Sequence, residues 1–165
     1  MKYMVGVLIA LFAPFSHAIP IVSLSPSSAV LAFNQAFTID VLVSGVEVTD
    51  PLIAFGFDIE TAVGLTYNTA TVAAPFFDDS GFFGTTDVAG STFPPVSGDD
   101  ILLSTLSLAT GTTAGFFDVS ILSGQPDFGF SEGLFSVLEI FGIDESVRVE
   151  VVGTPAIPIP STLLL

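Results

Sequence analysis

The side chains of this sequence that could do chemistry are carboxylates, and some of them occur as adjacent pairs in loops. Asp78-Asp79 and Asp99-Asp100 both lie in stretches rich in Gly, Ser and Pro. Carboxylate oxygens in such loops can bind calcium, with the weak affinities of about 10⁻⁴ to 10⁻³ M that are typical of extracellular sites. Neither pair has the Asp-x-Asp-x-Asp-Gly spacing of an EF-hand loop, so solvated surface charge is the simpler interpretation. The candidate calcium ligands are Asp78, Asp79, Asp99 and Asp100, and we expect no other cofactor.

A pair of carboxylates could also hydrolyse a glycosidic bond. No Asp or Glu in this sequence lies in a recognisable catalytic neighbourhood. Platforms that stack against sugar rings usually need Trp or Tyr, and beyond the first 18 residues only Tyr67 supplies one. We therefore expect no catalytic residues and no enzyme activity.

The N-terminal 18 residues have the pattern of a secretory signal peptide. Lys2 precedes an apolar run over residues 4–13, and small side chains precede an expected cut between Ala18 and Ile19. The run is too short to span a bilayer, which needs about 20 apolar residues. The protein is therefore expected to be exported through the inner membrane.

Removal of this leader leaves a strongly acidic chain without His, Cys, Lys or Trp. Arg148 is then the only basic side chain, against 17 Asp and Glu residues. The absence of His and Cys excludes Ser/His/Asp and Cys/His nucleophiles, thiol redox centres and ordinary zinc or copper sites. The negative charge repels a nucleic-acid backbone, so we expect no nucleic-acid partner. Without cysteines, the domain must be held together by burial alone.

Apolar and polar residues alternate in several short segments, which is the pattern of β-strands with one buried face. In residues 37–43 the apolar side chains fall on one face, and residues 53–59 and 147–151 repeat the alternation. Seven or more such strands without long helical periods predict an all-β domain over residues 19–153, an antiparallel β-sandwich of Ig-like or jelly-roll type. Residues 131–143 fit a short helical turn and a strand pair equally well. The less regular strands are expected at residues 30–33, 65–72, 101–109 and 116–122.

Two Phe pairs, Phe76-Phe77 and Phe82-Phe83, flank a short turn that contains Gly81. These rings could form an exposed apolar loop for a partner or a glycan. Because Phe is readily buried and a sandwich without disulfides needs apolar bulk, we expect them in the core.

Residues 37–46 and 53–60, followed by a strand that ends near Phe76, resemble the first half of a cohesin-like β-sandwich of exported bacterial proteins. The resemblance covers about a third of the chain, and other Ig-like sandwiches share its periodicity. It implies that the domain is cohesin-like.

The Pro-rich end of the chain, residues 154–165, is similar to a linker followed by the start of a PEP-CTERM sorting signal. Ile159 stands where that family has Glu, and neither the membrane helix nor the basic cluster of the family follows. The resemblance implies exosortase-type sorting machinery as a partner, and membrane contact only through a C-terminal helix that is missing here. The matching positions are Pro158, Pro160, Ser161, Thr162 and residues 163–165.

Together these observations predict a structural or adhesive protein of the cell surface or extracellular matrix, with exopolysaccharide or another matrix protein as its partner. The alternative is a soluble periplasmic or secreted module that binds calcium or carbohydrate.

Overall fold

The computed structural model describes residues 18–82, 86–124 and 132–153. Ala18 and Ile19, which flank the predicted cleavage site, are both exposed and lie just before the first strand. Outside the described residues lie the predicted leader up to residue 17 and the predicted sorting motif, Pro158, Pro160, Ser161 and Thr162.

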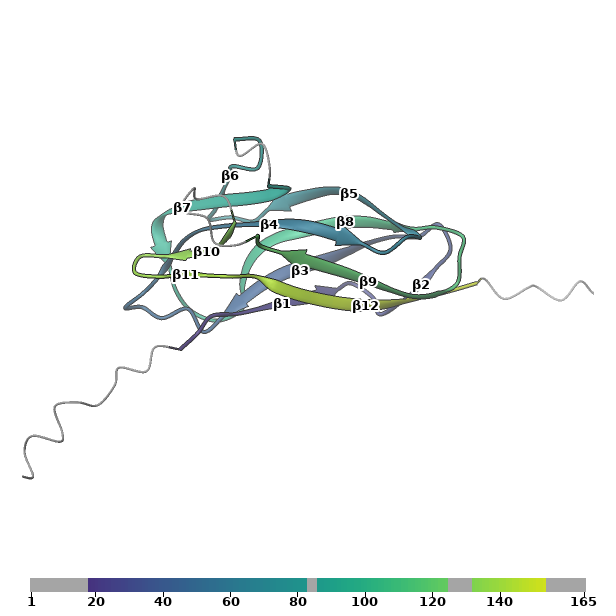
Figure 1. The fold of residues 1–165 in the computed structure, drawn as a ribbon, viewed down its shortest axis with the longest axis horizontal. Helices are drawn as coiled ribbons and strands as arrows, with labels where there is room; N and C mark the ends of the chain where they lie inside the picture. The colour runs from purple at the N-terminus through teal and green to yellow at the C-terminus, as the bar shows by residue number, and fades with distance from the viewer. Residues whose placement is uncertain (1–17, 83–85, 125–131, 154–165) are drawn as a thin grey trace, which may run out of the picture.

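Within the described residues the chain forms β-strands and no helix, which confirms the all-β prediction (Figure 1). Accordingly, this part of the chain contains no helix long and apolar enough to cross a bilayer. The strands are β1 (Ile21–Pro26), β2 (Val30–Ala32), β3 (Ala36–Ser44), β4 (Leu52–Thr61), β5 (Leu65–Val72), β6 (Phe77–Asp78), β7 (Val88–Val96), β8 (Ile101–Thr110), β9 (Gly115–Leu122), β10 (Gly133–Ser136), β11 (Ile140–Phe141) and β12 (Asp144–Val152).

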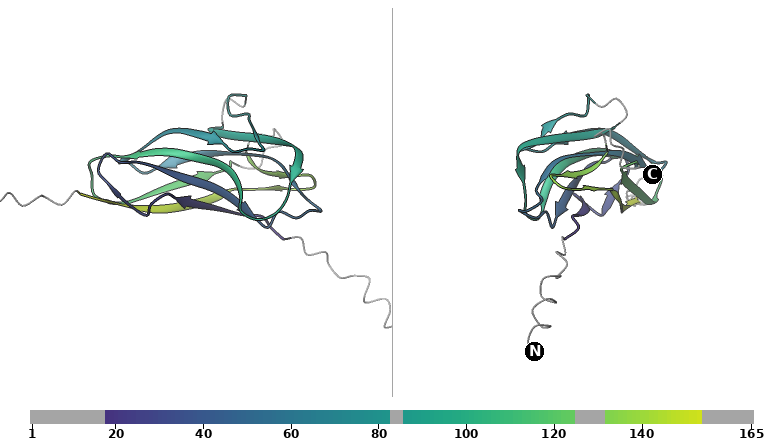
Figure 2. Two further views of the ribbon diagram at one scale, coloured as in Figure 1. Left: turned by 180° about the vertical axis from the view of Figure 1, so that it is seen from behind. Right: turned by 60° about the vertical axis from the view of Figure 1, so that its left-hand side comes forward.

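The strands form two sheets that face one another, as the right-hand view in Figure 2 shows. The smaller sheet has the order β1-β3-β8-β5, and the larger one has the order β11-β10-β4-β9-β12-β2. In the larger sheet β7 also pairs with β4, and β6 pairs with β7. Neighbouring strands are antiparallel except for β2, which runs parallel to β12. The predicted antiparallel β-sandwich is therefore confirmed.

The core lies between the sheets and is built by the alternation seen in the sequence. Along β3, Phe37, Ile39, Val41 and Val43 are buried, while the residues between them are exposed or half-buried. The larger sheet contributes side chains from β4, β9, β10 and β12, because the inward positions of both sheets meet in one layer. These include Phe55, Phe57, Val119, Ile121, Leu134, Val149 and Val151.

The ambiguous segment 131–143 forms a strand pair where the structure describes it. β10 pairs with β4 on one side and with β11 on the other. Asp50, which is buried, accepts hydrogen bonds from Ser136 Oγ at 2.6 Å and from the Leu138 N–H at 2.7 Å. This carboxylate fastens the β10–β11 turn to the loop before β4.

The expectation that the Phe pairs lie in the core is right for Phe76 and wrong for Phe77 and Phe82. Phe76 is buried and packs edge-to-face on Phe55, with ring centroids 5.1 Å apart. Phe77 and Phe82 are 64% and 85% exposed. The reason is that β6 points Phe77 to the outer side of the sheet, and Phe82 lies on the loop that follows. Phe83 lies outside the described residues.

Candidate functional site

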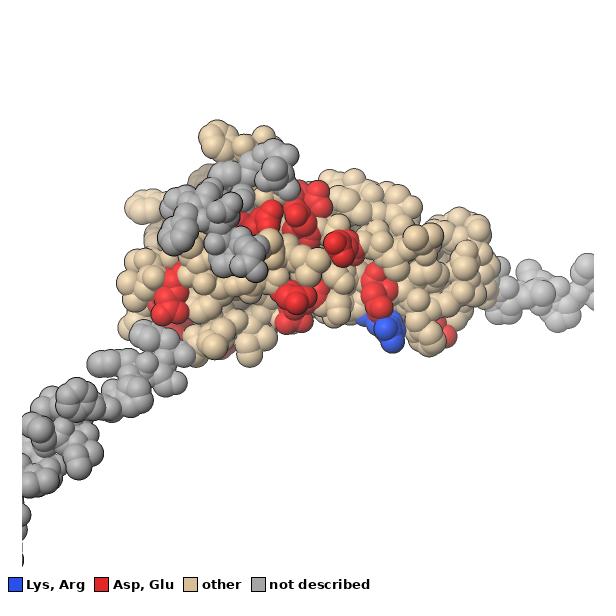
Figure 3. Space-filling model, in the orientation of Figure 1, with Lys and Arg blue, Asp and Glu red and all other residues tan. Residues whose placement is uncertain are grey.

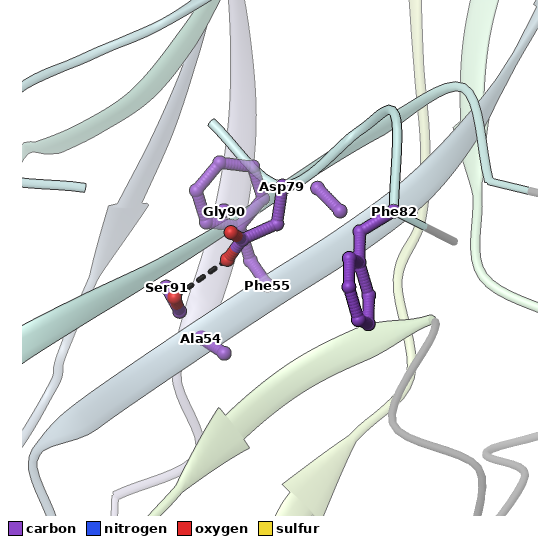
Figure 4. A pocket seen from close by; sticks show the side chains of 7 residues that line it. Ala54, Phe55, Asp79, Phe82, Gly90 and Ser91 are labelled. Carbon is purple, nitrogen blue, oxygen red and sulfur yellow. Dashed lines mark hydrogen bonds between the residues drawn. The ribbon is translucent and has the colours of Figure 1, made fainter. Parts of the chain in front are cut away.

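A groove of about 340 Å³ lies on the larger sheet, beside the loop between β6 and β7 (Figure 4). Its volume is at the lower end of the about 300 to 1,000 Å³ that is usual for ligand sites. The groove is lined by Ala54 and Phe55 of β4, by Ala89, Gly90 and Ser91 of β7, and by Asp79 and Phe82 of the loop.

The groove exists because small residues occupy neighbouring positions of adjacent strands. In one cross-strand row Phe77 lies opposite Ser91, Ser91 opposite Ala54, and Ala54 opposite Phe135. The two small residues in the middle of this row are flanked by two aromatic ones. Two residues further along the strands, where side chains again point to the same face, the row contains only small residues: Ala89, Gly56 and Gly133.

Asp79 is held at the edge of the groove by three hydrogen bonds. Ser91 Oγ donates to Asp79 Oδ2 at 2.5 Å, and the Asp79 N–H donates to the Ala89 carbonyl at 3.0 Å. The Phe82 N–H donates to the Asp79 carbonyl at 2.9 Å, which closes the turn. The carboxylate is thus tied to the floor at Ser91, while the ring of Phe82 lies across the groove from it (Figure 4).

Further carboxylates lie on the strands around this groove, with Asp58 on β4, Asp78 on β6 and Asp87 directly before β7. The Asp87 N–H donates to Asp58 Oδ1 at 3.1 Å, and Asp87 Oδ2 accepts from the Ile59 N–H at 2.9 Å. Burial first, and then the negative charges of Asp87 and Asp78, raise the pKa of the Tyr67 phenol above its usual value. Figure 3 shows acidic side chains at several separate places on this face of the molecule, with uncharged residues between them. The field around the groove therefore favours a positively charged ligand.

The structure places the predicted calcium ligands at two separate sites. Asp78 lies opposite Gly90 near the start of β7, whereas Asp99 and Asp100 follow the end of that strand. Asp99 Oδ1 accepts from the Gly45 N–H at 2.8 Å, so it fastens the β7–β8 turn to the end of β3. Among the described residues, no group of three or more Asp, Glu, His or Cys side chains is placed to hold a metal ion. Calcium binding at either pair stays a prediction.

Sequence reasoning missed the groove itself, although it singled out Asp78, Asp79 and the nearby Phe residues. Ala54, Gly90 and Ser91 carry no chemical signal of their own. They become a floor only through the register of β4 and β7.

No protein-family model and no curated protein matches this sequence. Solved structures with similar folds do exist. A cohesin module from a family 33 glycoside hydrolase of Clostridium perfringens is 11% identical, with a TM-score of 0.58 over 82% of this chain and 98% of that one. The OlpC cohesin of Clostridium thermocellum, solved in a type I cohesin–dockerin complex, is 10% identical, with a TM-score of 0.53 over 82% of this chain and 95% of that one. The OlpA cohesin of the same organism, also solved with a dockerin, is 9% identical, with a TM-score of 0.52 over 79% and 99% of the two chains. The chain therefore has a cohesin-like β-sandwich fold.

Proposed function

We propose that the protein is an exported, non-enzymatic interaction module that binds another protein through the groove on β4 and β7. The observation that carries this proposal is the groove, with small residues on its floor and exposed Phe side chains at Phe77 and Phe82. Exposed aromatic anchors beside a depression are typical of protein interfaces. The similar fold of two cohesins that were solved with dockerin partners supports a binding role.

Photo-crosslinking in cells of the source organism tests this function. A photoreactive phenylalanine replaces Phe82 in one variant and Phe116 in another. Phe82 lies on the loop between β6 and β7 and is 85% exposed, and Phe116 lies on β9 and is 69% exposed. We expect a discrete protein adduct from position 82 and none from position 116. The same adduct from both positions, or no adduct from position 82, would remove the groove as the binding surface.

We further propose that the protein acts at the cell surface or in an exopolysaccharide-rich matrix and is delivered there by its PEP-CTERM-like tail. The similarity at Pro158, Pro160, Ser161 and Thr162 supports this route. Sequencing the gene past the codon for Leu165 and fractionating the product test it. A reading frame that continues through an apolar helix to a basic end supports sorting by an exosortase, whereas a stop codon with soluble product removes it.

A calcium-binding module is the second candidate, because Asp78-Asp79 at the end of β6 and Asp99-Asp100 between β7 and β8 are adjacent carboxylate pairs. We expect a small rise in melting temperature with millimolar calcium. Magnesium at the same ionic strength measures the part of the rise that comes from screening of the acidic chain. A rise that is equal with both ions, or absent, removes the calcium hypothesis.

A further inference from the structure

The groove combines an apolar floor, one carboxylate and one aromatic ring, and this combination selects a particular kind of side chain. Resting on the proposed function, we propose that the groove binds a protonated Arg or Lys side chain that a partner protein inserts between Asp79 and Phe82.

The floor suits the aliphatic part of such a side chain. Ala54, Ala89 and Gly90 present short apolar surface, with the edge of Phe55 beneath them. Arg and Lys bury their methylene stems along apolar surface while the charged head seeks a polar partner. A purely apolar side chain would fit the floor equally well, but it would partly desolvate the adjacent carboxylate of Asp79 and leave its charge without a cationic partner, with Ser91 Oγ as its donor.

Asp79 supplies the partner for the charged head. Its backbone is fixed by Ala89 and Phe82, and its Oδ2 atom is fixed by Ser91, so the carboxylate is positioned before any ligand arrives. Hydrogen bonds between a carboxylate and a guanidinium or ammonium group are roughly twice as strong as neutral ones.

Phe82 supplies the second contact. Its ring lies on the side of the groove opposite Asp79 (Figure 4) and is 85% exposed. A cation within about 6 Å of such a ring is attracted to the negative face of the π-system, and more strongly when water is excluded.

The charge around the groove points to the same class of ligand. Asp78 is adjacent to Asp79 in the chain, Asp87 is two residues from Ala89, and Asp58 accepts from the Asp87 N–H. Arg148, the one basic side chain in the described residues, pairs instead with Asp118 on β9. The groove therefore has the charge complementarity that a basic partner requires, and no described side chain of its own neutralises it.

Titration of the full chain with a short blocked peptide tests this inference. The probe is acetyl-Gly-Gly-Arg-Gly-Gly-amide, and its neutral control carries citrulline in place of Arg. Nitrogen–proton NMR spectra follow the backbone amides of Ala54, Ala89, Gly90 and Ser91. We expect saturable shifts of these amides with the Arg peptide, with a dissociation constant in the millimolar range, and no saturable shift with citrulline.

Three variants separate the contributions of the Asp79 carboxylate, the Phe82 ring and the net charge of the chain to peptide binding. Asp79→Asn keeps an oxygen that accepts from Ser91 but removes the charge, and it should weaken binding by about tenfold. Phe82→Leu keeps apolar bulk but removes the ring, and it should weaken binding by about two- to fivefold. Asp144→Asn, an equal change of net charge on β12, should change binding by less than about twofold.

Equal binding of the Arg and citrulline peptides overturns the inference. So does an Asp144→Asn variant that loses as much affinity as Asp79→Asn, because general attraction to an acidic chain would then explain the binding. If the Arg peptide does not bind but position 82 still cross-links to a partner protein, the inference about the ligand is wrong and the proposed function stands. If position 82 also gives no adduct, the inference and the proposed function are both wrong.

Discussion

Gly64 lies so close to the ring of Phe117 that a β-carbon on Gly64 would be 2.5 Å from Phe117 Cε1. Gly64 occupies the turn between β4 and β5 with a φ of +115°, a conformation that other residues rarely adopt. Phe117 is a buried residue of β9. This contact packs the β4–β5 turn against the core, and it leaves no space for a side chain at position 64.

Gly64→Ala should therefore lower the free energy of unfolding by about 2 to 4 kcal/mol, because backbone strain and a displaced ring both contribute. Urea denaturation measures the loss. Gly81→Ala is the matched control: an added β-carbon there meets no atom within 4 Å, so the effect should stay within about 0.5 kcal/mol. Equal losses in the two variants would contradict the importance of the Phe117 contact.

Asp50→Ala should destabilise the fold by about 2 to 4 kcal/mol. The carboxylate is buried and accepts from Ser136 Oγ and the Leu138 N–H, and both donors would be left without it. Asp50→Asn retains one acceptor oxygen and should lose less. The measurement is again the urea midpoint, and an Asp50→Ala variant as stable as the parent chain would be inconsistent with this role.

Phe76 and Phe82 should respond very differently to the same substitution. Phe76→Ala empties a buried site against Phe55 and should cost about 3 to 5 kcal/mol. Phe82→Ala removes an exposed ring and should change stability by about 0.5 kcal/mol or less. Thermal melts of the two variants distinguish them, and a large loss from Phe82→Ala would mean that this ring has a structural role.

The pH dependence of stability should report the pair formed by Asp118 and Arg148. Arg148 donates through Nε to Oδ1 at 2.8 Å and through Nη2 to Oδ2 at 3.0 Å, and these hydrogen bonds hold the pKa of Asp118 below its ordinary 3.8. A lowered pKa means that the stabilisation is complete above pH 3.8 and is lost as the pH falls through the lowered value.

The matched comparison is Asp118→Asn against Asp144→Asn, since both remove one negative charge. At pH 7 the Asp118→Asn variant should melt at the lower temperature, and the difference should shrink as the pH falls below about 4 and through the lowered pKa of Asp118. A difference that stays constant as the pH falls through this range would show that the ion pair is not its cause. Because both partners are exposed, the effect at pH 7 should be small.

Strands with a clean alternation were predictable from the sequence. β3 and the central part of β12 have one buried face, and β5 covers the predicted residues 65–72. β7 was not predicted, because its small residues and its two prolines, Pro94 and Pro95, give no alternating apolar pattern. Its pairing with β4 comes from long-range contacts that a local pattern does not contain.

The candidate site was predictable only in part, for a similar reason. The sequence singled out Asp79 and Phe82, but as a calcium ligand and a core residue. The groove between them depends on Ala54 and Ser91, which the register places side by side. Whether a Phe faces inward or outward on a short strand and the following loop depends on the path of the chain, which local hydrophobicity does not determine.

The parallel pairing of β2 with β12 has a mechanical consequence. The described part of the chain begins and ends at opposite ends of the long axis of the sandwich (Figure 1). Val30, Leu31 and Ala32 lie beside Glu150, Val151 and Val152. Tension between these two ends enters through β1, which pairs with β3, and reaches the parallel pair of β2 and β12 behind it. It acts along these strands, so their hydrogen bonds are loaded in shear instead of being opened one after another. The domain is thus arranged to carry force along its length, and its unfolding rate under load, not its equilibrium stability, would limit how long it holds.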